Sequence, residues 1–156
     1  MRFTTVTLTI FNAFLLSASA STIPVKRSGE TLYLANCDIP SAVEYSEIAY
    51  YANGADSQNG QQPGDICDID DTGYITWEGS ERSCTFSDTG VTFTSDIASD
   101  AQSLADYSYA GPGWNNYGSF NCYKDNGRLL YSSGEASCYS IYYCLDVSYY
   151  FEYLKT

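Results

Sequence analysis

The chain has 156 residues, with 7 lysine and arginine residues against 19 aspartate and glutamate residues, and it contains no histidine. The net charge of −12 argues against nucleic acid as a partner, because nucleic-acid binding needs clustered basic side chains that displace counterions. The absence of histidine excludes Ser-His-Asp and Cys-His catalysis and zinc sites built on histidine.

Residues 1–20 have the three zones of a secretory signal peptide. Arg2 gives a basic start, Val6 to Leu16 form a mostly apolar run, and small residues end the segment at Ala20. The apolar run is too short to cross a bilayer as a helix, so we expect cleavage after Ala20 and no membrane span.

A short pro-segment is expected over residues 21–27. It ends in Lys26-Arg27, which is typical of a dibasic processing site in the secretory pathway. Cleavage there would leave residues 28–156 as a single secreted, extracellular domain, more acidic than the precursor because basic residues leave with the removed segment.

Six cysteines lie in this domain, at Cys37, Cys67, Cys84, Cys122, Cys138 and Cys144. An even number in an exported chain predicts three disulfide bonds, and the lack of a C-x-x-C pair argues against a metal cluster. Cys138 and Cys144 lie six residues apart in one predicted strand, too far apart to bond to each other. The other pairings stay open.

The first predicted strand covers residues 31–35. Ser41 and Glu44 match a capping box, so a helix is expected over residues 41–52, with Glu44 and Glu47 facing solvent. A polar loop without periodicity follows.

The middle of the chain predicts a β-meander and a second helix. Hydrophobic residues alternate in three runs near residues 74–77, 83–86 and 91–94, separated by turns. A helical pattern over residues 96–107 follows, and the Gly- and Pro-containing residues 111–118 are expected to be irregular.

The C-terminal third predicts further strands. Residues 119–124 and 128–131 flank Asp125-Asn126-Gly127, a strong hairpin signal, and residues 135–145 and 147–154 are expected to be two more strands. The order of elements predicts an α+β fold, in which two helices pack on an antiparallel sheet held by disulfides. An all-β sandwich or barrel with short helices is the alternative.

The acidic residues give only weak candidates for chemistry. Asp68 and Asp70 occupy positions 1 and 3 of an EF-hand pattern that fails further on, so Asp68, Asp70 and Asp71 are weak calcium candidates. No metal or other cofactor is expected. A small hydrolase of glycan or RNA that uses acids of residues 65–81 is the rival to a binding protein, but a chain with so many acids contains carboxylate pairs by chance. The sequence therefore favours a non-enzymatic protein.

The aromatic residues are the stronger signal. Trp114 and Tyr117 lie in the Gly/Pro/Asn-rich segment, and Tyr107 and Tyr109 lead into it. Tyrosine and tryptophan combine a large apolar area with a polar group, which suits a contact surface. We expect these four residues to contact an extracellular protein or a cell-wall glycan, and the protein to act as a monomer.

The layout of signal, Lys26-Arg27 site and small acidic domain with six cysteines resembles the small secreted cysteine-rich proteins of filamentous fungi. The predicted order of strands and helices is also similar to that of the α/β-sandwich killer toxins of smut-fungus viruses and their cellular relatives. The resemblance implies an effector-like or toxin-like role in which the protein binds a host or competitor molecule. It covers layout and no motif, so it assigns no role to any residue.

Overall fold

The computed structural model of the chain describes residues 29–40, 42, 44–52, 60–70 and 72–147. These residues form one antiparallel sheet of nine strands and a single turn of 3-10 helix. The elements are β1 (Thr31–Asp38), β2 (Tyr45–Tyr51), β3 (Asp65–Asp70), β4 (Glu81–Thr85), β5 (Thr92–Asp96), η2 (Ala101–Ser103), β6 (Tyr109–Trp114), β7 (Ser119–Lys124), β8 (Leu129–Ser133) and β9 (Ala136–Asp146).

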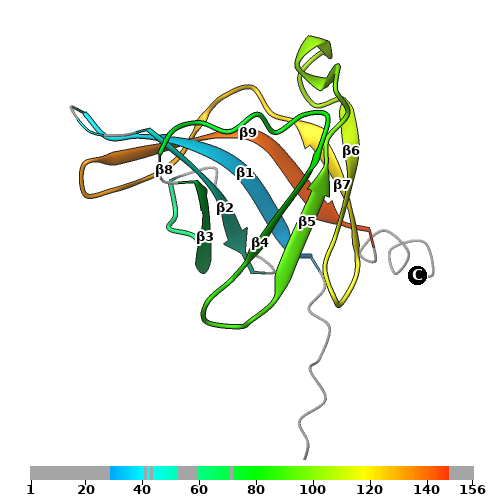
Figure 1. The fold of residues 1–156 in the computed structure, drawn as a ribbon, viewed down its shortest axis with the longest axis horizontal. Helices are drawn as coiled ribbons and strands as arrows, with labels where there is room; N and C mark the ends of the chain where they lie inside the picture. The colour runs from blue at the N-terminus through cyan, green and yellow to red at the C-terminus, as the bar shows by residue number, and fades with distance from the viewer. Residues whose placement is uncertain (1–28, 41, 43, 53–59, 71, 148–156) are drawn as a thin grey trace, which may run out of the picture.

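The sheet curls into a nearly closed barrel (Figure 1). Its strands follow the order β3-β2-β1-β9-β7-β6-β5-β4, so β3 and β4 are the two edges that meet at the seam. The disulfide Cys67–Cys84 joins these edge strands, with a Cα–Cα distance of 6.0 Å. A covalent link therefore closes the barrel at the place where the sheet ends.

Strand β9 pairs with three other strands. β1 lies along one side of it, while β7 and then β8 lie end to end along the other side. Between the end of β7 and the start of β8, Asp125 N donates to Ile141 O at 2.8 Å and Ser140 N donates to Arg128 O at 3.0 Å. The hydrogen bonds to β9 therefore continue past residues 126–127. The predicted hairpin at Asn126-Gly127 is therefore wrong, because those residues form a bulge on the partner of β9.

The other two disulfides also involve β9. Cys37–Cys138 ties it to β1, and Cys122–Cys144 ties it to β7. The expectation of three disulfides is confirmed, as is the expectation that Cys138 and Cys144 do not bond to each other.

Both faces of the sheet are buried around β1 and β2. The interior core fills the barrel, and the outer core covers the opposite face with help from β8. The interior core comprises Leu32, Leu34, Ile48, Cys67, Trp77, Phe86, Phe93, Ile97, Ala101, Ala110, Phe120, Cys122, Tyr142 and Cys144. The outer core comprises Tyr33, Ala35, Cys37, Ala49, Tyr51, Leu130, Tyr131 and Cys138.

A β-bulge at Ile141 allows one strand to serve both cores. Leu34 lies opposite Tyr142, whereas Ala35 lies opposite Ser140, so Ile141 is the extra residue. Because an extra residue reverses the alternation of side chains, Tyr142 enters the interior core while Cys138 enters the outer core.

The expected α+β fold with two helices is wrong, and the barrel that was the alternative describes the molecule better. The first expected helix, over residues 41–52, contains strand β2. Its side chains are buried on both faces between β1 and β3. The short apolar run fits both the helical and the strand period, and pairing with these two strands makes it a strand. Ser41 of the expected capping box lies outside the described residues.

The second expected helix, over residues 96–107, is reduced to η2. Lys124 Nζ donates to the carbonyl oxygens of Gln102 and Leu104, at 2.8 and 2.7 Å, and Ala98 N donates to Ala110 O. These bonds take backbone groups that an α-helix would need. Ile97 and Ala101 are nevertheless buried, as the helical pattern predicted.

Residues 111–118 are not irregular throughout, because β6 includes residues 111–114. A Cβ on Gly111 would lie 2.1 Å from Asp96 O, and one on Gly113 would lie 2.8 Å from Phe93 Cζ. The glycines therefore permit close packing of β6 on β5 rather than breaking the strand.

The other expected strands are confirmed in part. The strand at residues 31–35 and the strand at residues 135–145 are confirmed, and the meander is confirmed for β4 and β5 but not for residues 74–77. The expected strand at residues 147–154 lies outside the described residues except for its first position. Among the described residues, no helix has the length and apolar character needed to cross a membrane.

The disulfides give a test of what holds the barrel. The bond Cys67–Cys84 closes a loop of 17 residues, whereas Cys37–Cys138 closes one of 101. Chemical denaturation should show that replacing Cys67 and Cys84 with alanine lowers the free energy of unfolding by about 3 kcal/mol, and replacing Cys37 and Cys138 by about 5 kcal/mol, because longer loops restrict the unfolded chain more. The reverse order would contradict this account.

Candidate functional site

The four predicted contact residues lie in two separate groups, at the two ends of β6. Trp114 ends the strand and Tyr117 lies in the following turn, while Tyr109 begins the strand and Tyr107 precedes it. All four side chains are exposed, from 36% for Trp114 to 58% for Tyr107. The structure therefore exposes all four but does not bring them together.

The Trp114 end is a tight turn between β6 and β7. Asn115 Oδ1 accepts hydrogen bonds from Tyr117 N and Gly118 N, at 2.8 and 2.9 Å. Trp114 lies opposite Ser119 on β7 and Thr94 on β5, so its backbone belongs to the sheet. This end presents two aromatic side chains on a rigid turn.

The Tyr107 end has an unusual backbone. Tyr107 has φ of 67°, the left-handed conformation that residues other than glycine seldom adopt, and it is the one non-glycine residue with positive φ in the described part of the chain. Tyr107 N donates to Lys124 O at 2.8 Å, and Asn126 Nδ2 donates to Tyr107 Oη at 2.9 Å. Two neighbouring segments thus hold an exposed ring in a strained position.

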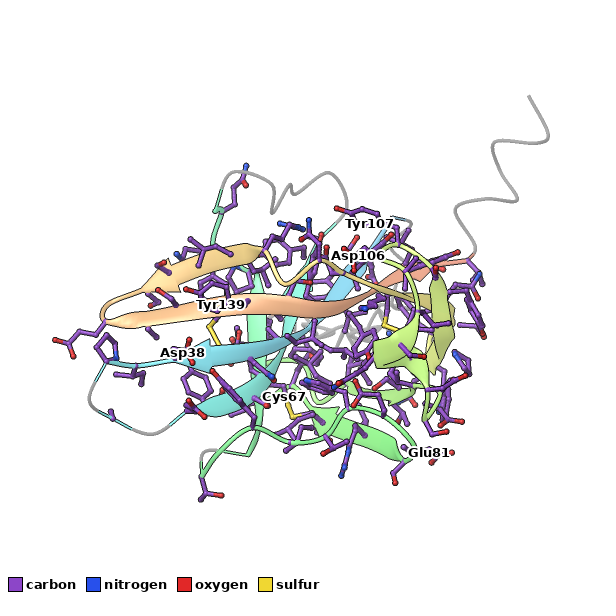
Figure 2. All side chains as sticks on the ribbon, turned by 90° about the horizontal axis from the view of Figure 1, so that it is seen from above. Asp38, Cys67, Glu81, Asp106, Tyr107 and Tyr139 are labelled. Carbon is purple, nitrogen blue, oxygen red and sulfur yellow. A yellow bond between two sulfur atoms is a disulfide. The ribbon has the colours of Figure 1, made fainter. Side chains whose placement is uncertain are left out.

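Figure 2 shows Tyr107 beside Asp106 on the side of the molecule away from Cys67 and Glu81. The Asp106 side chain is half exposed, and its carboxylate lies 3.7 Å from Lys124 Nζ. The Tyr107 end is therefore distant from the barrel seam.

A row of tyrosine rings begins at this end and crosses the outer face of the sheet. Tyr109 meets Tyr123 edge to face at 6.0 Å, and Tyr123 stacks on Tyr143 at 5.5 Å. Tyr143 then meets Tyr33 at 6.4 Å, and Tyr33 meets Tyr51 at 5.3 Å. The row is exposed at Tyr109 and buried at Tyr33 and Tyr51, so only its first part is open to a partner.

The buried part of the row leads to a second feature, a pocket of about 340 Å³ on the outer face. Tyr45 from β2 and Tyr131 from β8 form part of its wall, together with residues 62–66 and the start of β9. The segment before β3 reaches across to β8, because Gln62 Nε2 donates to Ser132 O at 2.7 Å. This contact sets one side of the pocket.

Behind this wall lies a fully buried carboxyl group, that of Glu47. Tyr131 Oη donates to Glu47 Oε1 at 2.6 Å, whereas Glu47 Oε2 has no hydrogen-bond partner among the described residues. Asp68 lies directly opposite Glu47 in the pairing of β2 with β3. Burial raises the pKa of Glu47 to about 7, the hydrogen bond from Tyr131 opposes this rise, and the charge of Asp68 adds to it.

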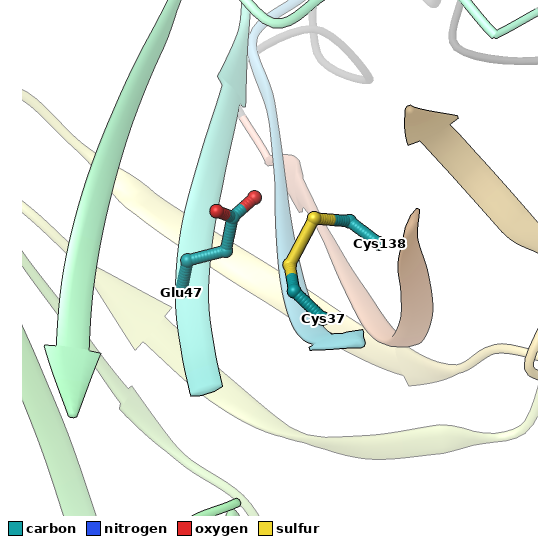
Figure 3. Close-up of side chains that lie close together, drawn as sticks. All are labelled: Cys37, Glu47 and Cys138. Atoms are coloured by element: carbon teal, nitrogen blue, oxygen red, sulfur yellow. A yellow bond between two sulfur atoms is a disulfide. The ribbon is translucent and has the colours of Figure 1, made fainter. Parts of the chain in front are cut away.

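Glu47 also lies beside the disulfide Cys37–Cys138 (Figure 3). A carboxylate oxygen of Glu47 and the two sulfur atoms lie within 4.8 Å of one another, a spacing that would suit a metal ion. The sulfurs are bonded to each other, however, and a disulfide does not supply the thiolates that bind metal. This cluster is therefore not a metal centre in the oxidised protein.

The weak calcium candidates do not form a loop. Asp68 and Asp70 belong to β3, and Asp71 lies outside the described residues, as does the side chain of Asp70. Extended backbone at Asp68 and Asp70 cannot wrap around an ion as an EF-hand loop does.

The acids proposed for a hydrolase are also dispersed. Glu78 is buried in the barrel, where it accepts a hydrogen bond from Tyr142 Oη, whereas Asp68 and Glu81 are exposed on different strands. Glu47 has the raised pKa of a general acid, but its complete burial keeps it from contact with a substrate.

Glu47 is the residue that the sequence interpretation placed wrongly, on the solvent face of a helix. The signal that would have found it is the composition of residues 45–51, which are rich in tyrosine and contain isoleucine, both typical of strands. A strand buried on both faces leaves no solvent side for a glutamate.

The raised pKa of Glu47 predicts a specific pH dependence of stability. Glu47 ionises near pH 4.5 in the unfolded chain but only near pH 7 in the folded protein. Between these two values the unfolded state is favoured, so the free energy of unfolding falls by about 3 kcal/mol as the pH rises, and it is constant above about pH 7. Denaturation curves between pH 4 and pH 8 should show that Glu47→Gln removes this loss. Glu44→Gln, at an exposed position three residues earlier, is the control and should leave it unchanged; equal effects would contradict the assignment.

Comparison with known proteins finds no family model, no curated protein and no solved structure that matches the chain.

Proposed function

We propose that the chain is a secreted effector-like or toxin-like protein that acts without catalysis, by binding an extracellular protein through a surface of two exposed and two half-buried tyrosines. The contact surface, named the tyrosine surface, consists of Tyr107, Tyr109, Tyr123 and Tyr143. Three disulfides are consistent with an extracellular protein, because such bonds persist in oxidising compartments.

The observation that carries this proposal is the backbone of Tyr107. A left-handed tyrosine costs free energy, and strain of this kind persists where the surrounding structure enforces it, often at binding sites. Lys124 O and Asn126 Nδ2 fix the backbone and the hydroxyl group of a ring that is 58% exposed. An ordered, exposed tyrosine loses little entropy on binding, which is why tyrosine is common in binding hot spots.

The ring geometry favours a protein over a glycan. A sugar ring packs on a flat, open aromatic face, but Tyr123 and Tyr143 stack on each other with planes 23° apart, and Tyr109 meets Tyr123 at 81°. The rings of Tyr109, Tyr123 and Tyr143 therefore do not form one flat platform. The excess of acidic over basic residues in the chain favours a partner with basic side chains.

Loss of the Tyr107 ring should weaken binding strongly without loss of stability. Tyr107→Gly removes the ring and relieves the positive φ, since glycine adopts this conformation without steric cost. Oxidised mature protein should capture a partner from the extracellular fluid of a host or competitor, and the dissociation constant of the identified partner should rise at least about tenfold for the variant, as for a hot-spot residue.

Tyr117→Ala is the matched control, because Tyr117 is also exposed but lies at the other end of the β6–β7 hairpin. It should leave binding and thermal stability nearly unchanged. Loss of binding in Trp114→Ala or Tyr117→Ala, but not in Tyr107→Gly, would move the contact to the Trp114 end. Capture of wall polysaccharide in place of protein would contradict the choice of partner.

Secretion and processing have their own test. Expression of the full chain in a eukaryotic secretory host should release a protein that begins at Ser28, if the signal is cut after Ala20 and the pro-segment after Arg27. Mass spectrometry of the medium measures this, and Lys26→Ala should shift the N-terminus to Ser21. Protein retained in the cytosol with residues 1–20 attached would contradict secretion.

A further inference from the structure

The pocket on the outer face is separate from the tyrosine surface. Tyr45 and Tyr131 line it together with Gln62, Asp65 and Ser133, and its volume of about 340 Å³ is at the small end for a ligand site. Aromatic rings and polar groups both line it, which suits a small molecule that carries both kinds of group.

The surroundings of the pocket are acidic. The described residues that line it include Asp65 but no lysine or arginine. Glu47 is buried behind Tyr131, and Asp68, which is exposed, lies opposite it in the pairing of β2 with β3. Both acids raise the pKa of the Tyr45 hydroxyl, after the larger effect of burial.

Glu47 is incompletely satisfied by the protein. Its Oε1 atom accepts the hydrogen bond from Tyr131, but its Oε2 atom is buried with no partner among the described residues. A buried carboxyl oxygen without a partner is costly, and a positive charge nearby would reduce that cost. Arg128, a basic residue near this core, makes an ion pair with Asp125 at 3.3 Å and lies over the Tyr33 ring.

We propose that this pocket binds the ammonium group of a small organic cation. The rings of Tyr45 and Tyr131 supply the aromatic wall that attracts a cation, and the carboxylate of Asp65 lines the pocket with them. Asp68, opposite Glu47 on the neighbouring strand, adds to the negative potential, and Glu47 adds to it once it is ionised. The absence of a basic side chain among the described lining residues leaves this potential without local compensation.

Proton release should accompany binding. The pKa of Glu47 is affected by Asp68 on β3 and by Tyr131 on β8, which donates a hydrogen bond to Glu47. Tyr45 and Tyr51 lie near Glu47 on β2, where the charge of Glu47 raises the pKa of both tyrosines. The charge of Arg128 lowers the pKa of Tyr51. A bound cation favours the ionised form of Glu47, so a neutral carboxyl should lose a proton when the ligand arrives.

Titration calorimetry with choline tests the proposal, and dimethylbutanol, its neutral isostere, is the matched ligand. The mature, oxidised protein should bind choline and not dimethylbutanol. Asp68→Asn should weaken choline binding about tenfold, while Asp88→Asn, which removes an exposed charge in the β4–β5 turn, should leave it unchanged. Both positions are exposed, and a thermal melt confirms that each variant is folded.

Two further measurements distinguish choline binding in the pocket from binding elsewhere on the protein. Choline heats measured at pH 6 in two buffers of different ionisation enthalpy should reveal proton release, and Glu47→Gln should abolish it while choline still binds. Tyr107→Gly should leave choline binding unchanged, which separates the pocket from the tyrosine surface. Equal binding of dimethylbutanol, equal loss in Asp68→Asn and Asp88→Asn, or no choline binding at millimolar concentration would overturn the proposal.

Discussion

Strand β9 is the constraint on which the rest of the fold depends. It pairs with β1 along one side and with β7 and β8 along the other, and it contains one cysteine of two of the three disulfides. The extra residue at Ile141 turns the strand between the two cores, so that one half closes the barrel and the other half covers the outer face. Without this bulge, Tyr142 and Cys138 would lie on the same face of the sheet.

Among the described residues, two glutamate side chains are buried in the interior of this small protein. Glu47 and Glu78 each accept a hydrogen bond from a tyrosine, Tyr131 and Tyr142 respectively, and burial raises the pKa of both tyrosines. A buried carboxyl group is tolerated when a donor satisfies it or when it stays protonated. Glu78 and Glu47 therefore act first as structural groups, and any functional role of Glu47 depends on what enters the neighbouring pocket.

The two proposed binding features differ in how they are built. The tyrosine surface depends on a strained residue, Tyr107, that Lys124 and Asn126 hold from adjacent segments. The pocket depends on a crossing segment that Gln62 ties to β8. The outer-face tyrosines run from one feature toward the other, because side chains on neighbouring strands line up across a sheet.

The loss of the expected helices also removes the order of elements on which the similarity to α/β-sandwich killer toxins rested.

The sequence by itself determined the six-cysteine framework, the strands with clear alternation such as β4 and β5, and the exposure of Trp114 and Tyr107. It did not determine whether residues 45–51 form a helix or a strand, because a short apolar run fits both periods, and it did not place Glu47. Those points were decided by the tertiary structure, since only pairing with β1 and β3 fixes which side chains of β2 are buried and which groups face them. Hydrogen bonds between residues distant in sequence, such as Lys124 to the carbonyl oxygens near η2, likewise replaced the second helix because they bind backbone groups that a helix would use internally.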